Sequence, residues 1–201
     1  MASRSGSPIF DLLVIFLVVY ALQFLTALAG LVSTLFVLSP PVTANPWTIV
    51  TSVYAHAGFT HLVSNALALV IFGWPIARAT TRIRFHLFFL TAGSIAGVSQ
   101  ILLSASLASA PVVDAAGTAG VLGASGAVFA LLGYLLASNR LSSSVAGVVG
   151  VPSWLKALLY LAIAIGLTVV TASPGAALIA HFIGLLVGLL AGKVSLLAIS
   201  Y

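Results

Sequence analysis

Six apolar runs, each close to the length that crosses a lipid bilayer, follow one another along this chain of 201 residues. A transmembrane helix needs about 20 predominantly apolar residues. Pro, Gly, Ser and Arg residues separate the runs, which predicts spans at about 9–38, 57–77, 85–107, 119–138, 151–171 and 175–198. Charged residues make up 4% of the chain, against roughly 25% in ordinary globular domains. We therefore expect an all-α, polytopic membrane protein whose six-helix bundle forms a single domain over residues 1–201.

The basic residues indicate how the bundle is oriented. They lie beside alternate connections, at Arg4, Arg78, Arg82, Arg84, Arg140, Lys156 and Lys193. Because Lys and Arg mark cytoplasmic loops, both termini are expected in the cytoplasm of a multi-pass plasma-membrane protein. Trp74 and Trp154 then lie near the inner interface and Trp47 near the outer one. Topology explains the net charge of +5 better than a nucleic-acid partner does, and the absence of cysteine excludes disulfides.

A different interpretation of the N-terminus is a cleavable signal peptide. Arg4, the apolar run and Ala27-Leu28-Ala29 imitate one. Against it, the apolar run continues to Leu38 and Asp11 interrupts its start. Removal of this span would also upset the alternation of basic loops, so we expect it to be retained.

Polar side chains recur at one level of the predicted bundle. Spans two, four and six would all run inward from the outer face, and they carry His61 with Asn65, Ser125, and His181 respectively. Ser125 and His181 each lie about six residues into a span, a depth of roughly 9 Å at 1.5 Å per residue. Polar groups at such a depth are costly unless they serve a site, so these four residues are the candidate functional cluster.

Small residues give spans four and six a reason to touch. Gly184, Gly188 and Gly192 repeat every four residues on span six, and Gly126 and Ala130 do so on span four. Such stripes let helix backbones approach closely in lipid, although ordinary bundle packing would explain any one glycine equally well. Close packing of these spans would bring Ser125 and His181 together.

A serine hydroxyl becomes a strong nucleophile when a neighbouring imidazole takes its proton. Ser125 and His181 supply that pair. A third, acidic member is not expected, because the carboxylates of the chain are Asp11, at the cytoplasmic start of span one, and Asp114, in an outer loop. Donors for an oxyanion are expected from His61, Asn65 and the backbone N–H of Ser125. His56 stands about 140° around a helix from His61 and is expected in the preceding loop.

Other hydrolytic chemistries lack their residues. The chain contains no glutamate, so a His-Glu-x-x-His zinc site is absent, and neither aspartate suits a membrane-embedded acid pair. His61 and His181 have no obvious third metal ligand, and no metal site is expected. Ala127 stands where an α/β-hydrolase elbow requires glycine.

Three blocks of sequence together resemble the rhomboid family of intramembrane serine proteases. They contain His56, His61 and Asn65; Gly123, Ser125 and Gly126; and His181 with Gly184 and Gly188. The resemblance covers nearly the whole chain and implies a six-helix core. It further implies a Ser125 nucleophile, a His181 general base and acid, and an oxyanion site at His61, Asn65 and the Ser125 N–H. Water would enter from the outer face. The expected substrates are transmembrane proteins, cut near helix-destabilising segments after a small residue, and no cofactor is implied.

The sequence departs from the family pattern at three places. Thr48 follows Trp47 where arginine is frequent, and Ala77 lies in a stretch where an acidic residue is common. Phe129 replaces a tyrosine that often packs on the catalytic histidine. These changes affect loop anchoring and ring stacking more than the reaction itself.

Two other functions fit parts of the pattern. The missing loop charges favour a protein of the same fold that binds membrane clients without cutting them. A small transporter would need polar residues along a path through the bilayer, whereas the inward part of span four, Leu131 to Leu136, is nearly apolar.

Overall fold

The computed structural model describes residues 7–108, 119–138 and 177–198, together with the single positions 152, 155, 158, 159, 161, 162, 165 and 166. These parts are helical and contain no named strand, as the sequence predicts. The elements are α1 Pro8–Ala27, α2 Val32–Phe36, α3 Thr48–Tyr54, α4 Phe59–Ala77, α5 Arg82–Ala108, α6 Ser125–Ser138 and α9 Leu178–Lys193. Most of the predicted span 151–171 lies outside the described residues, as do Arg4, Asp114, Arg140, Trp154 and Lys156.

Three of the described helices are long and apolar enough to cross a membrane: α1, α4 and the Arg82–Ser106 part of α5. Two more apolar helices, α6 and α9, are shorter. Large apolar side chains on the outside of the bundle, such as Phe24 at 72% exposed and Leu28 at 83%, would contact lipid. Helices suit that solvent because they satisfy their backbone hydrogen bonds internally.

Two helices have other bounds than the predicted spans that contain them. The first apolar run is not one helix over 9–38, because α1 ends at Ala27 and α2 begins at Val32. Between them Gly30 takes a φ of +69°, a left-handed conformation that ends the helix. The fourth run begins as loop, so Ser125 is the first residue of α6 and not the sixth residue of a span. The short helix α3, which lies before α4, was not predicted.

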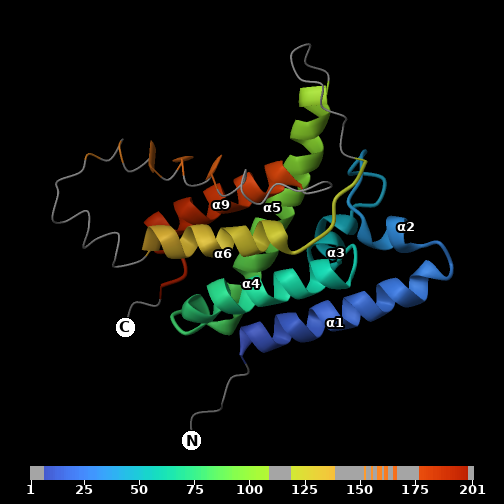
Figure 1. Ribbon diagram of the computed structural model, residues 1–201, viewed down its shortest axis with the longest axis horizontal. Coiled ribbons are helices and arrows are strands. Elements are labelled where there is room, and N and C mark those ends of the chain that lie inside the picture. Colours follow the sequence, from blue (N-terminus) through green and yellow to red (C-terminus); the bar gives the residue numbers. More distant parts are fainter. Residues whose placement is uncertain are drawn as a thin grey trace, which may run out of the picture.

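Helices α4, α6 and α9 run in the same direction, and α6 and α9 lie side by side (Figure 1). The glycines of α9 show the register. A methyl group added at Gly184 would collide with the backbone of Gly126, one at Gly188 with that of Ala130, and one at Gly192 with that of Tyr134. The residue numbers of α6 and α9 rise together along this contact. The two helices are therefore parallel and begin at the same end of the bundle. Helix α1 lies along α4 and runs the opposite way.

An ion-pair cluster joins α1 to α5 near the start of α1. Arg82 donates two hydrogen bonds to the carboxylate of Asp11, from Nε at 2.6 Å and from Nη2 at 2.8 Å. His86 Nε2 lies 3.0 Å from the same carboxylate. The two-pronged pairing fixes the angle as well as the distance between the helices.

Candidate active site

Ser125 and His181 meet where α6 and α9 begin. Ser125 is the first residue of α6 and His181 the fourth of α9. The Nε2 atom of His181 lies 2.9 Å from the Oγ atom of Ser125, within hydrogen-bond distance. The structure therefore brings together the two residues whose pairing the sequence predicts.

Glycine makes this approach possible. Gly184 lies directly against the backbone of Gly126, and a Cβ atom at Gly184 would overlap the Gly126 carbonyl group. Gly126 is the residue after Ser125, and Gly184 is one helical turn after His181. The closest contact of the two backbones is thus adjacent to the Ser125–His181 pair, as expected for small residues at a helix interface in lipid.

The ring of Phe129 sets the plane of the His181 imidazole. The two rings are stacked, with centroids 4.5 Å apart and an angle of 8° between their planes. Phe129 stands one turn after Ser125, so α6 supplies both the hydroxyl and the aromatic face that orients its partner. His181 is 8% exposed, and its Nδ1 atom has no hydrogen-bond partner among the described residues. Stacking, and not a carboxylate, holds the imidazole in this part of the structure.

His61 lies against the loop that precedes Ser125. A Cβ atom at Gly123 would be 2.6 Å from Cε1 and 2.9 Å from Nε2 of the His61 ring. Gly123 also has a φ of +136°, which residues with a side chain rarely adopt. Both the backbone conformation and the contact with His61 therefore require glycine at this position.

A hydrogen bond determines which nitrogen of His61 is the donor. The backbone N–H of Ala57 donates to His61 Nδ1 at 3.3 Å, so Nδ1 carries no proton. A neutral imidazole then carries its proton on Nε2. That is the nitrogen beside Gly123, and it is available to donate toward the Ser125 end of the loop.

Asn65 and His56 support His61 from two sides. Asn65 is buried and donates from Nδ2 to the carbonyl oxygen of His61 at 2.9 Å, which leaves its second N–H available. His56 lies between α3 and α4, as expected, and its buried ring meets that of His61 edge-on with centroids 5.3 Å apart. Phe16 on α1 contacts the His56 ring in the same manner at 4.9 Å.

The loop before Ser125 is held by backbone pairing. Leu38 and Val121 exchange two N–H to carbonyl hydrogen bonds, of 3.0 and 2.8 Å. The N–H of Gly123 donates to the Ser52 carbonyl oxygen at 2.8 Å. The first N–H groups of a helix have no partner within it. The N–H of Ser125, at the start of α6, has no partner among the described residues and is thus suited to bind an anion.

Two buried glutamines, which no sequence motif marks, also position the site. Gln23 on α1 accepts from the N–H of His56 at 2.9 Å and donates to its carbonyl oxygen at 3.2 Å. Gln100 on α5 accepts from the N–H of Ala180 at 3.1 Å, next to His181. The sequence does mark both glutamines, because each is a single amide side chain within an apolar span. Placing such a polar group in lipid is costly, as it is for a hydroxyl.

Comparison with known proteins agrees with these features. The family model described as "Rhomboid domain" matches residues 43–197. The chain is also similar to "Putative rhomboid protease YdcA" of Bacillus subtilis (strain 168), with 30% identity over 90 residues. That similarity spans 45% of this chain and 40% of the relative.

Proposed function

The chain belongs to the rhomboid family, and we propose that it is an intramembrane serine endopeptidase with a Ser125–His181 dyad. The observation that carries the proposal is the 2.9 Å separation of His181 Nε2 and Ser125 Oγ, at the buried meeting point of two parallel apolar helices. The proposed substrates are membrane proteins, cut in or near their transmembrane segments. The enzyme itself is an integral, multi-pass membrane protein.

In the proposed first step, His181 Nε2 takes the proton of the Ser125 hydroxyl as Oγ attacks the peptide carbonyl carbon. The C–N bond of the tetrahedral intermediate then breaks, and the imidazolium gives its proton to the leaving amine. Water, activated by the same imidazole, releases the acyl group and restores the serine. For Nε2 to accept a proton, the resting ring carries its own proton on Nδ1.

Three donors are available for the negative oxygen of that intermediate. They are the N–H of Ser125, Nε2–H of His61, and the second N–H of Asn65. Each belongs to a group that the fold holds rigidly, through the start of α6, the Ala57 N–H bond and the His61 carbonyl bond. Fixed donors stabilise a developing charge without reorganising, which is why such groups supply a large part of catalysis.

Entry of substrate and water is proposed from the outer face, where the orientation expected from the basic residues places the beginnings of α4, α6 and α9. A small cavity beside Ser125 has four glycines in its lining, Gly93, Gly97, Gly123 and Gly126. A cavity of this small size suits a small substrate residue. The resemblance to rhomboid proteases implies such a residue before the scissile bond. The chemistry proposed here uses no metal or organic cofactor.

Labelling with a fluorophosphonate tests the proposal without knowledge of the natural substrate. Wild-type protein in detergent should form a covalent adduct on Ser125 and cleave a model transmembrane substrate. Both signals should fall to background in Ser125→Ala and in His181→Ala, while Ser138→Ala, on the same helix but at its other end, should retain them. Equal cleavage by wild type and Ser125→Ala would refute the dyad, and capture of a membrane client without cleavage would favour the binding-protein alternative.

A further inference from the structure

Gln23 is a buried polar residue on α1, a helix that ends before the residues matched by the Rhomboid domain model begin. Its side chain is 6% exposed. An amide within an apolar span is costly unless it finds a partner. The partner of Gln23 is the backbone of His56, in the segment between α3 and α4. These bonds connect α1 to the segment that leads into the helix of His61.

The amide of Gln23 binds both polar groups of the His56 backbone. Its Oε1 atom accepts from the N–H of His56 at 2.9 Å, and its Nε2 atom donates to the carbonyl oxygen at 3.2 Å. A flipped amide would place donor against donor and acceptor against acceptor. The two bonds therefore fix the orientation of the amide and hold the peptide groups on both sides of His56.

The carbonyl group of His56 and the N–H of Ala57 belong to one peptide group. Because a trans peptide group is planar, its carbonyl and its N–H point in opposite directions. Gln23 binds the carbonyl side, and the N–H side donates to Nδ1 of His61 at 3.3 Å. A chain of hydrogen bonds thus runs from Gln23 through a single peptide group to the His61 ring, and bonds in such chains strengthen one another.

Other neighbours of His61 do not determine which ring nitrogen carries the proton. Asn65 donates to the carbonyl oxygen of His61 and not to its ring. The His56 ring meets the His61 ring edge-on, and neither nitrogen of His56 has a hydrogen-bond partner among the described residues. In the described part of the chain, the bond from Ala57 is therefore the one that selects the tautomer of His61.

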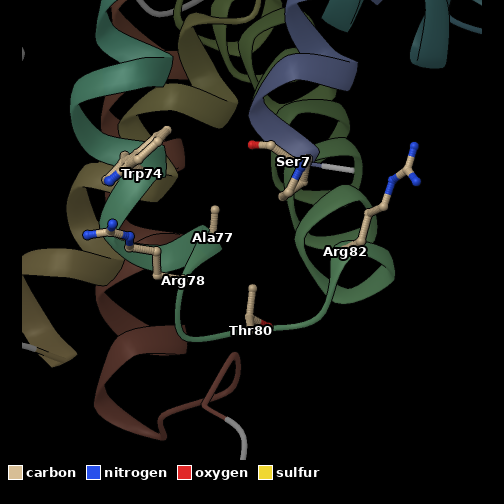
Figure 2. A pocket seen from close by; sticks show the side chains of 7 residues that line it. Ser7, Trp74, Ala77, Arg78, Thr80 and Arg82 are labelled. Carbon is tan, nitrogen blue, oxygen red and sulfur yellow. The ribbon is translucent and has the colours of Figure 1, made fainter. Parts of the chain in front are cut away.

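Helix α1 has no comparable tie to α4 at its other end. A cavity of about 360 Å³ lies there between the first residues of α1 and the end of α4, with Ser7 on one side and Trp74 and Ala77 on the other (Figure 2). Asp11 instead joins this end of α1 to Arg82 on α5. The bonds of Gln23 are thus what fixes α1 to the segment leading into α4, at the end where Ser125 lies.

We propose that Gln23 is a positioning residue for the oxyanion site. Through the peptide group that joins His56 to Ala57, it keeps His61 in the tautomer with the proton on Nε2, beside Gly123. This inference rests on the proposed function, in which that N–H binds the oxyanion. It places one determinant of the site on a helix that the Rhomboid domain model does not match.

The tautomer of His61 can be measured without any substrate, by nitrogen NMR of the full-length chain labelled at histidine. The chain contains four histidines, and the signals lost in His61→Phe identify those of His61. At neutral pH the wild-type His61 should carry its proton on Nε2. Gln23→Met keeps the length of the side chain but loses both bonds, so the peptide group can rotate and both tautomers should be populated. A wild-type proton on Nδ1, or an unchanged tautomer in Gln23→Met, would overturn the proposal.

Cleavage of a model transmembrane substrate gives a second test. Gln23→Met should lower kcat about fivefold, the effect of one net hydrogen bond, and leave KM unchanged. Rates are counted per Ser125 labelled by fluorophosphonate, so that unfolded molecules do not contribute. In a His61→Phe background the same substitution should cause no further loss, because Gln23 acts through His61. An equal fivefold loss in both backgrounds would show a merely structural role and overturn the proposal.

Thr26→Val is the matched control on the same helix. The Thr26 hydroxyl donates to carbonyl oxygens of α1 itself, those of Leu22 and Gln23. Its loss should leave kcat and the His61 tautomer as in the wild type, and equal effects of Thr26→Val and Gln23→Met would contradict the role of Gln23. The expected change of tautomer in a protein that cleaves no substrate would refute the proposed protease function and leave the hydrogen-bond chain supported.

Discussion

Phe129 shows how a single side chain can orient an imidazole that has no carboxylate partner among the described residues. Its ring lies parallel to the His181 imidazole, 4.5 Å away, on the same helix as Ser125. A stack of this kind restricts rotation of the imidazole about χ2, so that Nε2 stays directed at the hydroxyl. Orientation is one of the two tasks that an aspartate performs in a Ser-His-Asp triad; the other is stabilisation of the imidazolium.

We predict that Phe129→Leu lowers kcat roughly three- to tenfold, the range that loss of a ring–ring contact implies. KM should change little, because substrate binding does not depend on the stack. Phe129→Tyr keeps the ring and should stay near wild-type rates. The measurement is steady-state cleavage of a model transmembrane substrate in detergent. A Leu variant with wild-type kcat would show that the stack does not orient His181.

His61 provides a second test at the residue scale. His61→Phe keeps a ring beside Gly123 but removes the Nε2–H donor, and it should lower kcat on the order of 10²-fold. Thermal unfolding of the variant, measured alongside, separates a lost donor from a damaged fold. If kcat stayed at the wild-type value with the fold intact, His61 would not be an oxyanion donor.

At the scale of elements, the contact between α6 and α9 determines whether the site exists. Each glycine of the α9 stripe faces backbone atoms of α6, so neither helix can tolerate a larger residue there without moving. Because both helices are rigid, the displacement would occur along the whole contact between α6 and α9. This would separate Ser125 from His181, which lie where the contact between α6 and α9 begins.

Gly188→Ala should therefore destabilise the protein by about 1–3 kcal/mol, the usual cost of overpacking, and should lower the rate of fluorophosphonate labelling. Gly166→Ala is the control, because a Cβ atom at Gly166 would meet no atom of the described residues within 4 Å. Unfolding midpoints and labelling rates of the two variants give the comparison. Equal midpoints and equal labelling rates for the two variants would mean that the contact between α6 and α9 adjusts to a methyl group.

The contact between α6 and α9 could be predicted from the sequence because it depends on a local pattern, small residues at every fourth position. Gly184, Gly188 and Gly192 mark a face of a helix wherever the helix lies. The start of α6 was not predictable, because residues 119–124 are as apolar as the helix that follows, and the bonds between Leu38 and Val121 hold part of them extended. The partners of Gln23 and Gln100 were hidden for a similar reason. Each is distant in the sequence, and only the folded arrangement identifies it.

On the scale of the whole molecule, α1 and α2 lie before the residues that the Rhomboid domain model matches. Helix α1 is nevertheless joined to that domain at both ends. Asp11 binds Arg82 and His86 on α5, and Gln23 binds the backbone of His56 beside His61. The position of the proposed oxyanion site thus depends on a helix outside the matched region.

Asp11→Asn should lower the free energy of unfolding by about 1–2 kcal/mol, less than for a fully buried pair because Arg82 is half-exposed. Asp11→Asn should destabilise an Arg82→Gln variant less, because that variant has already lost the ion pair. A double-mutant cycle on thermal unfolding measures this coupling. Additive effects of the two substitutions would show that the pair does not join α1 to α5.

The common direction of α4, α6 and α9 has an electrical consequence. The peptide dipoles of a helix add up to roughly half a positive charge at its N-terminus. Three helices begin near Ser125, so their positive ends converge on the place where the oxyanion would form. In surroundings poor in water this potential is weakly screened, and it favours a negative intermediate over the neutral peptide before any side chain donates a hydrogen bond.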